Sequence, residues 1–469
     1  MSQPTRRDLL DGIAGGFAGV ALAGMLARDG LAGPVAPHGG LHHRPRARRV
    51  IQLFMNGGAS QMDLFDYKPQ LTKMKGVQIP DSVVGGKRFS TMTGSQTVRP
   101  CLPEITKFKQ NGDSGAWVSD FMSHTAEIPD ELCFVKSMHT TQVNHAPAIC
   151  FFLTGSEMPG RPSIGSWLTY GLGSETADLP GFVVMTSRDK EASCGQIFYD
   201  FYWGSGFLPS KFQGVKFRGS GDPVLYLSNP DGISRESRRA VLDDLAKMNE
   251  LTLKDFGDPE ISTRISQYEM AYRMQMSVPE LTDFSKEPKS VLEMYGPDVQ
   301  WQGSFAYNCL MARRLAERGV RFIQLYHQDW DHHGGLPGAL PKLCQETDQP
   351  AAALIKDLKT RGLLDDTLVV WAGEFGRTPF SQGSDGRDHN PLGYSIWMAG
   401  GGVKGGVSFG ETDDFSYNIV KDPVHVNDLN ATILHCLGID HERFTFKFQG
   451  LDQRLTGVEK TNVVKEILL

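Results

Sequence analysis

Short apolar runs recur along most of the chain and alternate with amphipathic stretches. The first run, Val50 to Met55, breaks into Asn56-Gly57-Gly58, as a buried strand does before a tight turn. Five similar runs follow, at residues 132–135, 181–185, 320–326, 367–372 and 394–398. Amphipathic stretches at 302–318 and 349–361 lead directly into two of these runs. Strands that alternate with helices predict an α/β fold with a mostly parallel central sheet and helices on both faces.

Three further segments complete the expected organisation. Residues 236–300 are charged and predict helices at 238–251 and 261–276, which we interpret as a helical insertion. Residues 33–48 are rich in Gly, Pro, His and Arg and predict a flexible linker. Residues 424–438 predict a helix that is capped by Asn427 or Asp428 and ends at Gly438. One folded domain is therefore expected over residues 49–469.

The first 32 residues predict export. Arg6 and Arg7 precede an apolar stretch from Ile13 to Leu26, and small residues follow around Ala32. A stretch of about fourteen apolar residues is shorter than the roughly twenty that a bilayer-spanning helix needs. This order is typical of a twin-arginine signal peptide at residues 1–32, whereas a membrane anchor or a buried helix is the alternative. We expect the protein to pass through the twin-arginine export machinery and to be periplasmic or secreted.

Composition narrows the possible partners. The formal net charge of -6 argues against a nucleic-acid surface, and no later apolar run is long enough to span a membrane. The seven cysteines are scattered and include no C-x-x-C pair, so the sequence predicts no disulfide framework. At least one thiol is free unless it pairs between chains.

The loop after the predicted strand at 320–326 is the richest in chemically active side chains. Five of the seven residues from His327 to His333 are histidine or aspartate. Ligands of an open α/β sheet bind beyond the carboxyl ends of its strands, where this loop is expected. Carboxylates mixed with imidazoles suit zinc or manganese. The loop therefore predicts a metal or acid/base site, and a hydrated surface loop is the alternative.

Two further loops hold groups suited to an anionic substrate. Asn56 and Asp63 belong to the turn after the first strand, where glycine N–H groups can face an anion. Asn144 and His145 come directly before Pro147, which favours the first turn of a helix. Such a helix start attracts a bound anion through its free N–H groups.

The last of these loops follows the strand at 367–372. Glu374 at the end of that strand is suited to bind a metal, and Arg377 to recognise a tetrahedral oxyanion. Asp388 and His389 come shortly after. The alternative for Arg377 is a salt bridge that braces the loop. Together the loops predict metal-assisted displacement at phosphorus or sulfur.

These motifs resemble the alkaline phosphatase and sulfatase superfamily and, more closely, the exported family called domain of unknown function 1501. The closer resemblance covers the chain from about Arg49 to its end. It rests on Arg6-Arg7-Asp8-Leu9-Leu10, Phe54-Met55-Asn56-Gly57-Gly58 with Gln61 and Asp63, Gly373-Glu374-Phe375-Gly376-Arg377-Thr378-Pro379, Asp388-His389-Asn390 and Gly400-Gly401-Gly402-Val403-Lys404-Gly405-Gly406.

The sulfatase resemblance implies an altered nucleophile. In the matching motif, His145 takes the position that becomes formylglycine, and Pro147 and Thr154-Gly155 fall into place. Histidine cannot yield formylglycine, so the standard sulfatase mechanism is not expected. By the same resemblance Glu374 stands for a metal aspartate, and Asn56 stands for another. Asp63 replaces the latter only if its loop folds back.

The sequence thus predicts an alkaline-phosphatase-like three-layer sandwich with a divalent metal, zinc, manganese or calcium. The expected substrate is a sulfate or phosphate ester, including those of sulfated or phosphorylated glycans. His145, Asn144 and Arg377 are the predicted catalytic residues. The predicted metal-site residues are Asp329, Asp331, His332, His333, Glu374, Asp388, His389, Asn56 and Asp63.

Two alternatives remain open at this point. One is a catalytically degenerate hydrolase fold that binds an anionic glycan or a cell-envelope partner, which the lost nucleophile favours. The other is a phosphomutase-like enzyme, which would need a nucleophile such as Ser60, Thr140 or Thr141.

Overall fold

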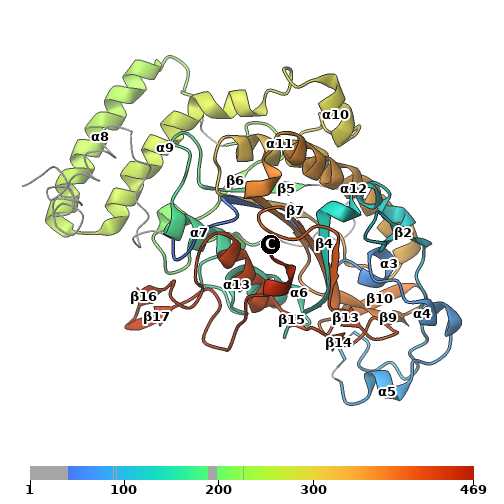
Figure 1. The fold of residues 1–469 in the computed structure, drawn as a ribbon. Helices are drawn as coiled ribbons and strands as arrows, with labels where there is room; N and C mark the ends of the chain where they lie inside the picture. Colours follow the sequence, from blue (N-terminus) through green and yellow to red (C-terminus); the bar gives the residue numbers. More distant parts are fainter. Residues whose placement is uncertain (1–40, 88, 91, 188–197, 225–226) are drawn as a thin grey trace, which may run out of the picture.

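A computed structural model describes residues 41–87, 89–90, 92–187, 198–224 and 227–469 of the chain (Figure 1). The predicted signal peptide at residues 1–32 lies outside the described residues. Within them, none of the helices combines the length and apolar character needed to cross a membrane.

A nine-stranded sheet forms the centre of the fold, in the order β12-β4-β11-β8-β1-β7-β5-β6, with β15 paired to β4. Only β11 runs antiparallel to its neighbours, so the sheet is mostly parallel, as predicted. A β-hairpin precedes β11 in place of a crossover helix, which explains its direction. Its strands are β1 (Arg49–Met55), β4 (Leu132–His139), β5 (Phe182–Ser187), β6 (Val215–Phe217), β7 (Phe322–His327), β8 (Thr367–Ala372), β11 (Tyr394–Ala399), β12 (Val407–Phe409) and β15 (Val424–His425). All six apolar runs of the sequence form strands of this sheet.

Helices cover both faces of the sheet, and β1 shows why. Ile51 and Leu53 pack into one hydrophobic core with α11 (Phe305–Glu317) and α12 (Leu336–Thr360). Val50 and Phe54, which point the other way, pack with α6 (His145–Thr154), α7 (Ile164–Leu172) and α13 (Val426–Cys436). Side chains of a strand alternate between faces, so one apolar run supplies both cores. The predicted three-layer α/β architecture is confirmed (Figure 1).

The segment that we expect to be a helical insertion, residues 236–300, is covered mainly by three helices. They are α8 (Arg235–Phe256), α9 (Pro259–Thr282) and α10 (Lys289–Tyr295). Figure 1 shows α8 at the outer edge of the molecule, with α9 between it and the sheet.

Smaller elements surround this framework. The short helices are α3 (Gln61–Leu64), α4 (Pro69–Lys73) and α5 (Asp81–Val84). The two-stranded sheets pair β2 (Phe108–Asn111) with β3 (Ala116–Ser119), β9 (Gly376–Gln382) with β10 (Gly386–Asn390), β13 (Glu411–Thr412) with β14 (Ile419–Lys421), and β16 (Phe446–Phe448) with β17 (Leu451–Gln453). The six described cysteines are buried and free, which agrees with the absence of a disulfide framework.

Three predicted boundaries differ from the structure. The helix expected from Gln349 begins at Leu336, because Pro337 is accommodated in its first turn. The cap of α13 is His425 rather than Asn427 or Asp428: the His425 side chain accepts a backbone N–H, and Asp428 closes the capping box. The last part of the expected linker is ordered against the fold, since N–H groups of residues 42–47 bond to carbonyls of residues 436 and 438.

Candidate metal centre

The turn after β1 meets the loop after β7 at the carboxyl edge of the sheet. The Trp330 N–H donates to the Asn56 carbonyl at 3.1 Å, and the Asn56 N–H donates to the His327 carbonyl at 2.8 Å. Gly57 has a φ of +121°, and a Cβ there would lie 2.6 Å from the backbone nitrogen of Asp331. Only glycine fits this approach, which fixes the position of the Asp331 backbone.

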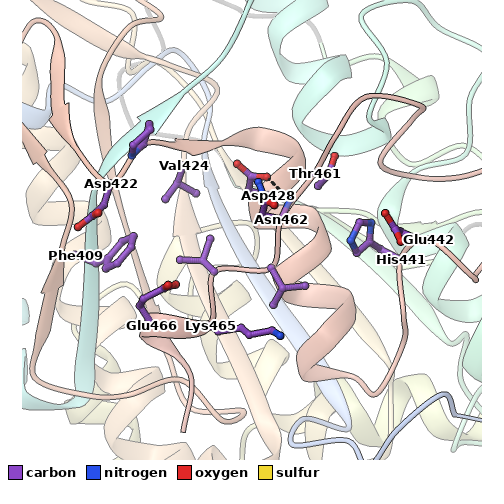
Figure 2. Close-up of a pocket in the computed structure, with 13 residues that line it drawn as sticks. Phe409, Asp422, Val424, Asp428, His441, Glu442, Thr461, Asn462, Lys465 and Glu466 are labelled. Atoms are coloured by element: carbon purple, nitrogen blue, oxygen red, sulfur yellow. Dashed lines mark hydrogen bonds between the residues drawn. The ribbon is translucent and has the colours of Figure 1, made fainter.

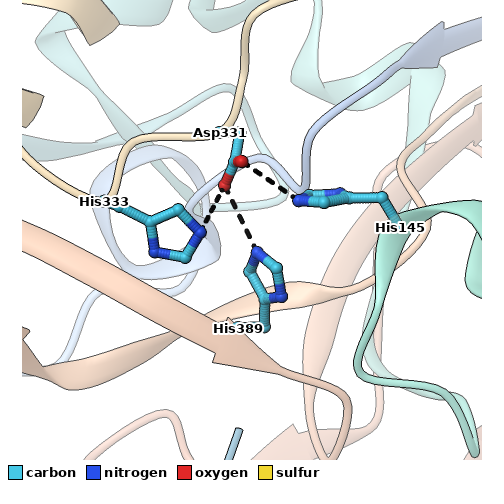
Figure 3. A group of neighbouring side chains, drawn as sticks. All are labelled: His145, Asp331, His333 and His389. Atoms are coloured by element: carbon cyan, nitrogen blue, oxygen red, sulfur yellow. Dashed lines mark hydrogen bonds and ion pairs between the residues drawn. The ribbon is translucent and has the colours of Figure 1, made fainter. Parts of the chain in front are cut away.

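Four side chains converge beside this turn (Figure 3). They are His145 at the start of α6, Asp331 and His333 after β7, and His389 on β10, and their ligand atoms lie within 4.8 Å of one another. Asp331 is central: its oxygens lie 3.1 Å from Nε2 of His145, 3.0 Å from Nε2 of His333 and 3.3 Å from Nε2 of His389.

The other nitrogen of each imidazole, Nδ1, already has an acceptor. The pairs are His145 with Glu374 at 2.7 Å, His333 with Gln382 Oε1 at 2.5 Å, and His389 with the Val143 carbonyl at 2.6 Å. A hydrogen bond to an acceptor places the proton of a neutral imidazole on Nδ1. The three Nε2 atoms therefore face the Asp331 carboxylate, an arrangement that a proton or a cation between them must stabilise.

The pKa values of Asp331, His145 and His389 are shifted by burial and by their neighbours. Burial would raise the pKa of Asp331, but hydrogen bonds from the three imidazoles and the Arg377 charge hold it well below its usual range. Burial would lower the pKa of His145, but its hydrogen bonds to Asp331 and Glu374 raise it. Burial lowers the pKa of His389 to about 4, although Asp331 opposes this shift. Three imidazoles and one carboxylate fit zinc or manganese, and these residues are suited to hold such an ion.

Glu374 does not belong to the four converging side chains. It is buried, and Oε1 accepts hydrogen bonds from the Gly57 N–H at 2.9 Å and from Nδ1 of His145 at 2.7 Å. Its position revises the expectation of a metal ligand, because the carboxylate is committed to these two donors. Glu374 orients His145 from behind, as carboxylates commonly do for metal-binding histidines.

Arg377 braces the same loops. It is buried, and it donates through Nε to the Gly58 carbonyl at 2.8 Å and through Nη2 to Asp331 at 2.6 Å. It also donates to the carbonyls of Arg387 and Gly57. The guanidinium is thus directed at protein oxygens, which revises the expectation that it orients a substrate anion.

Two predicted metal residues lie in other networks. Asp63 forms a fully buried ion pair with Arg387, with Oδ2 2.8 Å from Nε. Asp388 accepts hydrogen bonds from Ser90 and Thr93, both at 2.5 Å. Neither carboxylate faces the four converging side chains, so neither supports the expected role as a ligand.

The remaining predicted residues surround the group without joining it. His332 is buried, and burial lowers its pKa to about 4. Asp329 is buried in the left-handed backbone region, with a φ of +74°. The Asn56 side chain is buried without a hydrogen-bond partner among the described residues, whereas Asn144 is exposed as the N-cap of α6. Gln382 and Val143 carry no signal in the sequence and were not predicted.

Comparison with known proteins identifies the family. The sequence matches the family described as "Protein of unknown function (DUF1501)" over residues 47–468. The chain belongs to this family. The predicted family is therefore confirmed, and no curated protein matches the chain.

Solved structures similar to this DUF1501 chain come from the alkaline phosphatase and sulfatase superfamily. A phosphonate monoester hydrolase from Silicibacter pomeroyi is 12% identical, covers 90% of this chain and 76% of its own, and gives a TM-score of 0.34. A sulfatase from Pseudoalteromonas sp. is 13% identical, with 96% and 76% covered and a TM-score of 0.34. A protein in the alkaline phosphatase superfamily from Vibrio parahaemolyticus is 10% identical, with 85% and 68% covered and a TM-score of 0.35. At these scores the similarities carry no argument about activity.

A second polar region of the DUF1501 chain lies beside the start of α13 (Figure 2). A cavity of about 660 Å³ is lined there by Asp428, His441, Glu442 and Lys465, among others. Asp428 accepts backbone N–H groups from His425 at 3.0 Å and Asn462 at 2.7 Å. Its carboxylate therefore secures the backbone, and the cavity does not gather ligand atoms as the first region does.

Proposed function

We propose that this protein is an exported, metal-dependent hydrolase of sulfate or phosphate esters that works without formylglycine. One divalent ion would be held by His145, Asp331, His333 and His389. The observation that carries the proposal is the convergence of three imidazole Nε2 atoms on one carboxylate. An ion pair or a plain surface loop would not require every Nδ1 to be held by an acceptor.

Side chains next to the proposed ligands hold them in position. Glu374 fixes the tautomer of His145 by accepting its Nδ1 proton, and Arg377 fixes Asp331 through Oδ1. The side chains of His145 and His333 are 20% and 22% exposed, so the group is partly open to solvent. A divalent ion there would supply a Lewis acid for an ester oxygen and lower the pKa of a water.

His145 changes role in this proposal. With Nδ1 bound to Glu374 and Nε2 directed at Asp331, neither nitrogen is left to attack an ester. We therefore assign His145 to metal binding rather than to the nucleophile position that the sulfatase resemblance gave it.

The lack of a nucleophile among the proposed ligands favours a second candidate function. The four proposed ligands include no hydroxyl or thiol nucleophile, so a metal-bound protein that binds an anionic glycan or a cell-envelope partner without turnover fits the site as well. Metal content does not distinguish the two functions, but turnover does.

The test is metal analysis of the purified protein, followed by assays with aryl sulfates and aryl phosphates. We expect about one equivalent of a divalent metal, and its loss in His145→Ala, His333→Ala and His389→Ala. His124→Ala is the matched control, because its side chain is partly exposed, pairs with Glu127 and lies outside the four converging side chains.

The outcomes separate the candidates. The metal centre would be refuted if the wild-type protein held no stoichiometric metal, or if all three variants kept their metal. Metal with ester turnover supports the hydrolase, and metal without turnover on any ester favours the binding function.

A further inference from the structure

Helix α8 carries an apolar stripe that the rest of the described chain leaves uncovered. Val241, Leu245, Met248 and Phe256 follow helical spacing along one side, and they are 58%, 37%, 64% and 78% exposed. Residues three and four apart lie on the same side of a helix, and Thr252 fills the remaining position of this row. A row of this length is unusual on a free surface.

The opposite side of α8 already has its partner. Leu242 is buried, and Arg239 pairs with Glu269 of α9 at 2.5 Å. Arg235 and Arg239 also lie over the Tyr272 ring of α9. Helix α8 therefore packs on α9 with one face, and the exposed stripe lies on another face that does not contact α9.

Charges beside the stripe lack partners. Arg238 and Asp255 flank it near opposite ends of α8, and neither forms an ion pair with another residue of the described chain. Arg239, by contrast, is fully paired on the side that faces α9. The unpaired charges have opposite signs, so the stripe has a basic end and an acidic end.

The pattern is complementary to itself when the helix is reversed. The midpoint between Arg238 and Asp255 in the sequence falls between Ala246 and Lys247. Leu245 and Met248 have the same midpoint. In an antiparallel pair of α8 helices, Leu245 of one copy faces Met248 of the other. Both Arg238–Asp255 pairs form in that same register, as a two-fold interface requires.

We propose that α8 is the dimerisation helix of this protein and that a second copy of the chain covers its stripe. The two α8 helices run antiparallel, the apolar side chains form the centre, and Arg238 pairs with Asp255 of the other copy at each end. Helices α9 from both copies lie outside this pair, which gives a four-helix contact.

The test is the molar mass of the purified protein, measured by light scattering across the micromolar range. We expect a dimer for the wild type and a monomer for Met248→Glu, which places a charge at the centre. Arg238→Asp and Asp255→Arg alone each bring like charges together, so each should weaken dimerisation about tenfold or more.

Mixing the two single charge variants tests the register. Each Arg238→Asp chain complements an Asp255→Arg chain at both ends, so the mixture should associate with close to wild-type affinity. Glu250→Arg is the matched control: it makes the same charge change on α8, outside the stripe, and should leave the dimer intact. Metal content should be unchanged in all of these variants.

Several results would overturn the proposal. These are a monomeric wild type, a dimeric Met248→Glu, or a charge mixture that does not associate. A monomeric wild type that binds phosphatidylglycerol vesicles, with binding lost in Met248→Glu, would assign the stripe to a membrane instead.

Discussion

Two regions of this molecule gather histidines and carboxylates, but only one of them orients these groups toward a common point. Beside Asp331, three imidazoles are held through Nδ1 and present Nε2 to the same carboxylate. Beside α13, Asp428 accepts two backbone N–H groups, and Nδ1 of His441 contacts the Thr456 hydroxyl at 3.1 Å. The difference lies in what each polar atom is already bonded to, not in the kinds of residues present.

The electrostatics differ in the same way. Burial lowers the pKa of His425 and of His441, and the nearby carboxylates do not reverse that effect. For His145, hydrogen bonds to two carboxylates overcome burial and raise the pKa. His389 faces only one of these carboxylates, and burial still lowers its pKa to about 4, so the contrast in pKa concerns His145.

The largest effect is expected from Asp331→Ala. The substitution removes the central carboxylate and leaves Arg377 buried without its charged partner, which costs about 3–5 kcal/mol of unfolding free energy. We expect metal to be lost as well. Denaturant unfolding and metal analysis measure the two effects.

Asp428→Ala is the matched change in the second region. It removes two hydrogen bonds to the backbone and should cost about 1–3 kcal/mol without loss of metal. Equal metal loss in both variants would contradict the contrast between the regions.

The next largest effect is expected from Gly57→Ala. Its φ of +121° and a Cβ placed 2.6 Å from the backbone of Asp331 mean that the loops must separate. We expect a loss of about 3 kcal/mol in unfolding free energy, with weaker metal binding. Gly257→Ala, at a φ of +67° with no heavy atom within 4 Å of the added Cβ, should cost only about 1 kcal/mol. Similar losses for both would show that the approach of the loops is not tight.

A smaller and more specific effect is expected from Glu374→Gln. The amide preserves shape but removes the charge that supports His145, so metal affinity should fall about 10–100-fold. Competition with a chromogenic chelator measures this affinity. Glu346→Gln is the control, since Glu346 lies 3.3 Å from Nε2 of His327 outside the four converging side chains. An unchanged affinity in Glu374→Gln would remove Glu374 from the site.

The smallest effect is expected from His441→Ala. Its hydrogen bond to Thr456 is partly exposed, so we expect a loss of about 1 kcal/mol in unfolding free energy. Metal content and ester turnover should not change. A loss of metal in this variant would place the functional site beside α13 and not beside Asp331.

The fold was largely predictable because short apolar runs in the sequence indicate buried strands. All six runs are strands of the central sheet, and the helices before β7 and β8 were anticipated. The direction of β11 was not, because the hairpin before it reads as a loop rich in glycine and charge. Strand pairing over such a distance depends on tertiary contacts that no local pattern records.

The site was predicted as a region but not atom by atom. Within the loop 327–333, Asp331 and His333 join the four converging side chains, whereas His332 and His327 do not. The sequence predicts Asp388 and His389 as ligands together, although neighbours on a strand point to opposite faces. Recognising β10 as a strand would have separated them. Nothing in the sequence marks Val143 or Gln382 as acceptors.

The four proposed ligands come from three distant parts of the chain, between His145 and His389. No fragment of the protein contains them all, and the chain must reach near-native topology before an ion has a complete set of donors. The ions that are abundant where folding finishes would therefore determine which ion the proposed site binds. If the chain is exported already folded, as its first residues predict, the proposed site would take up its ion in the cytoplasm, before export.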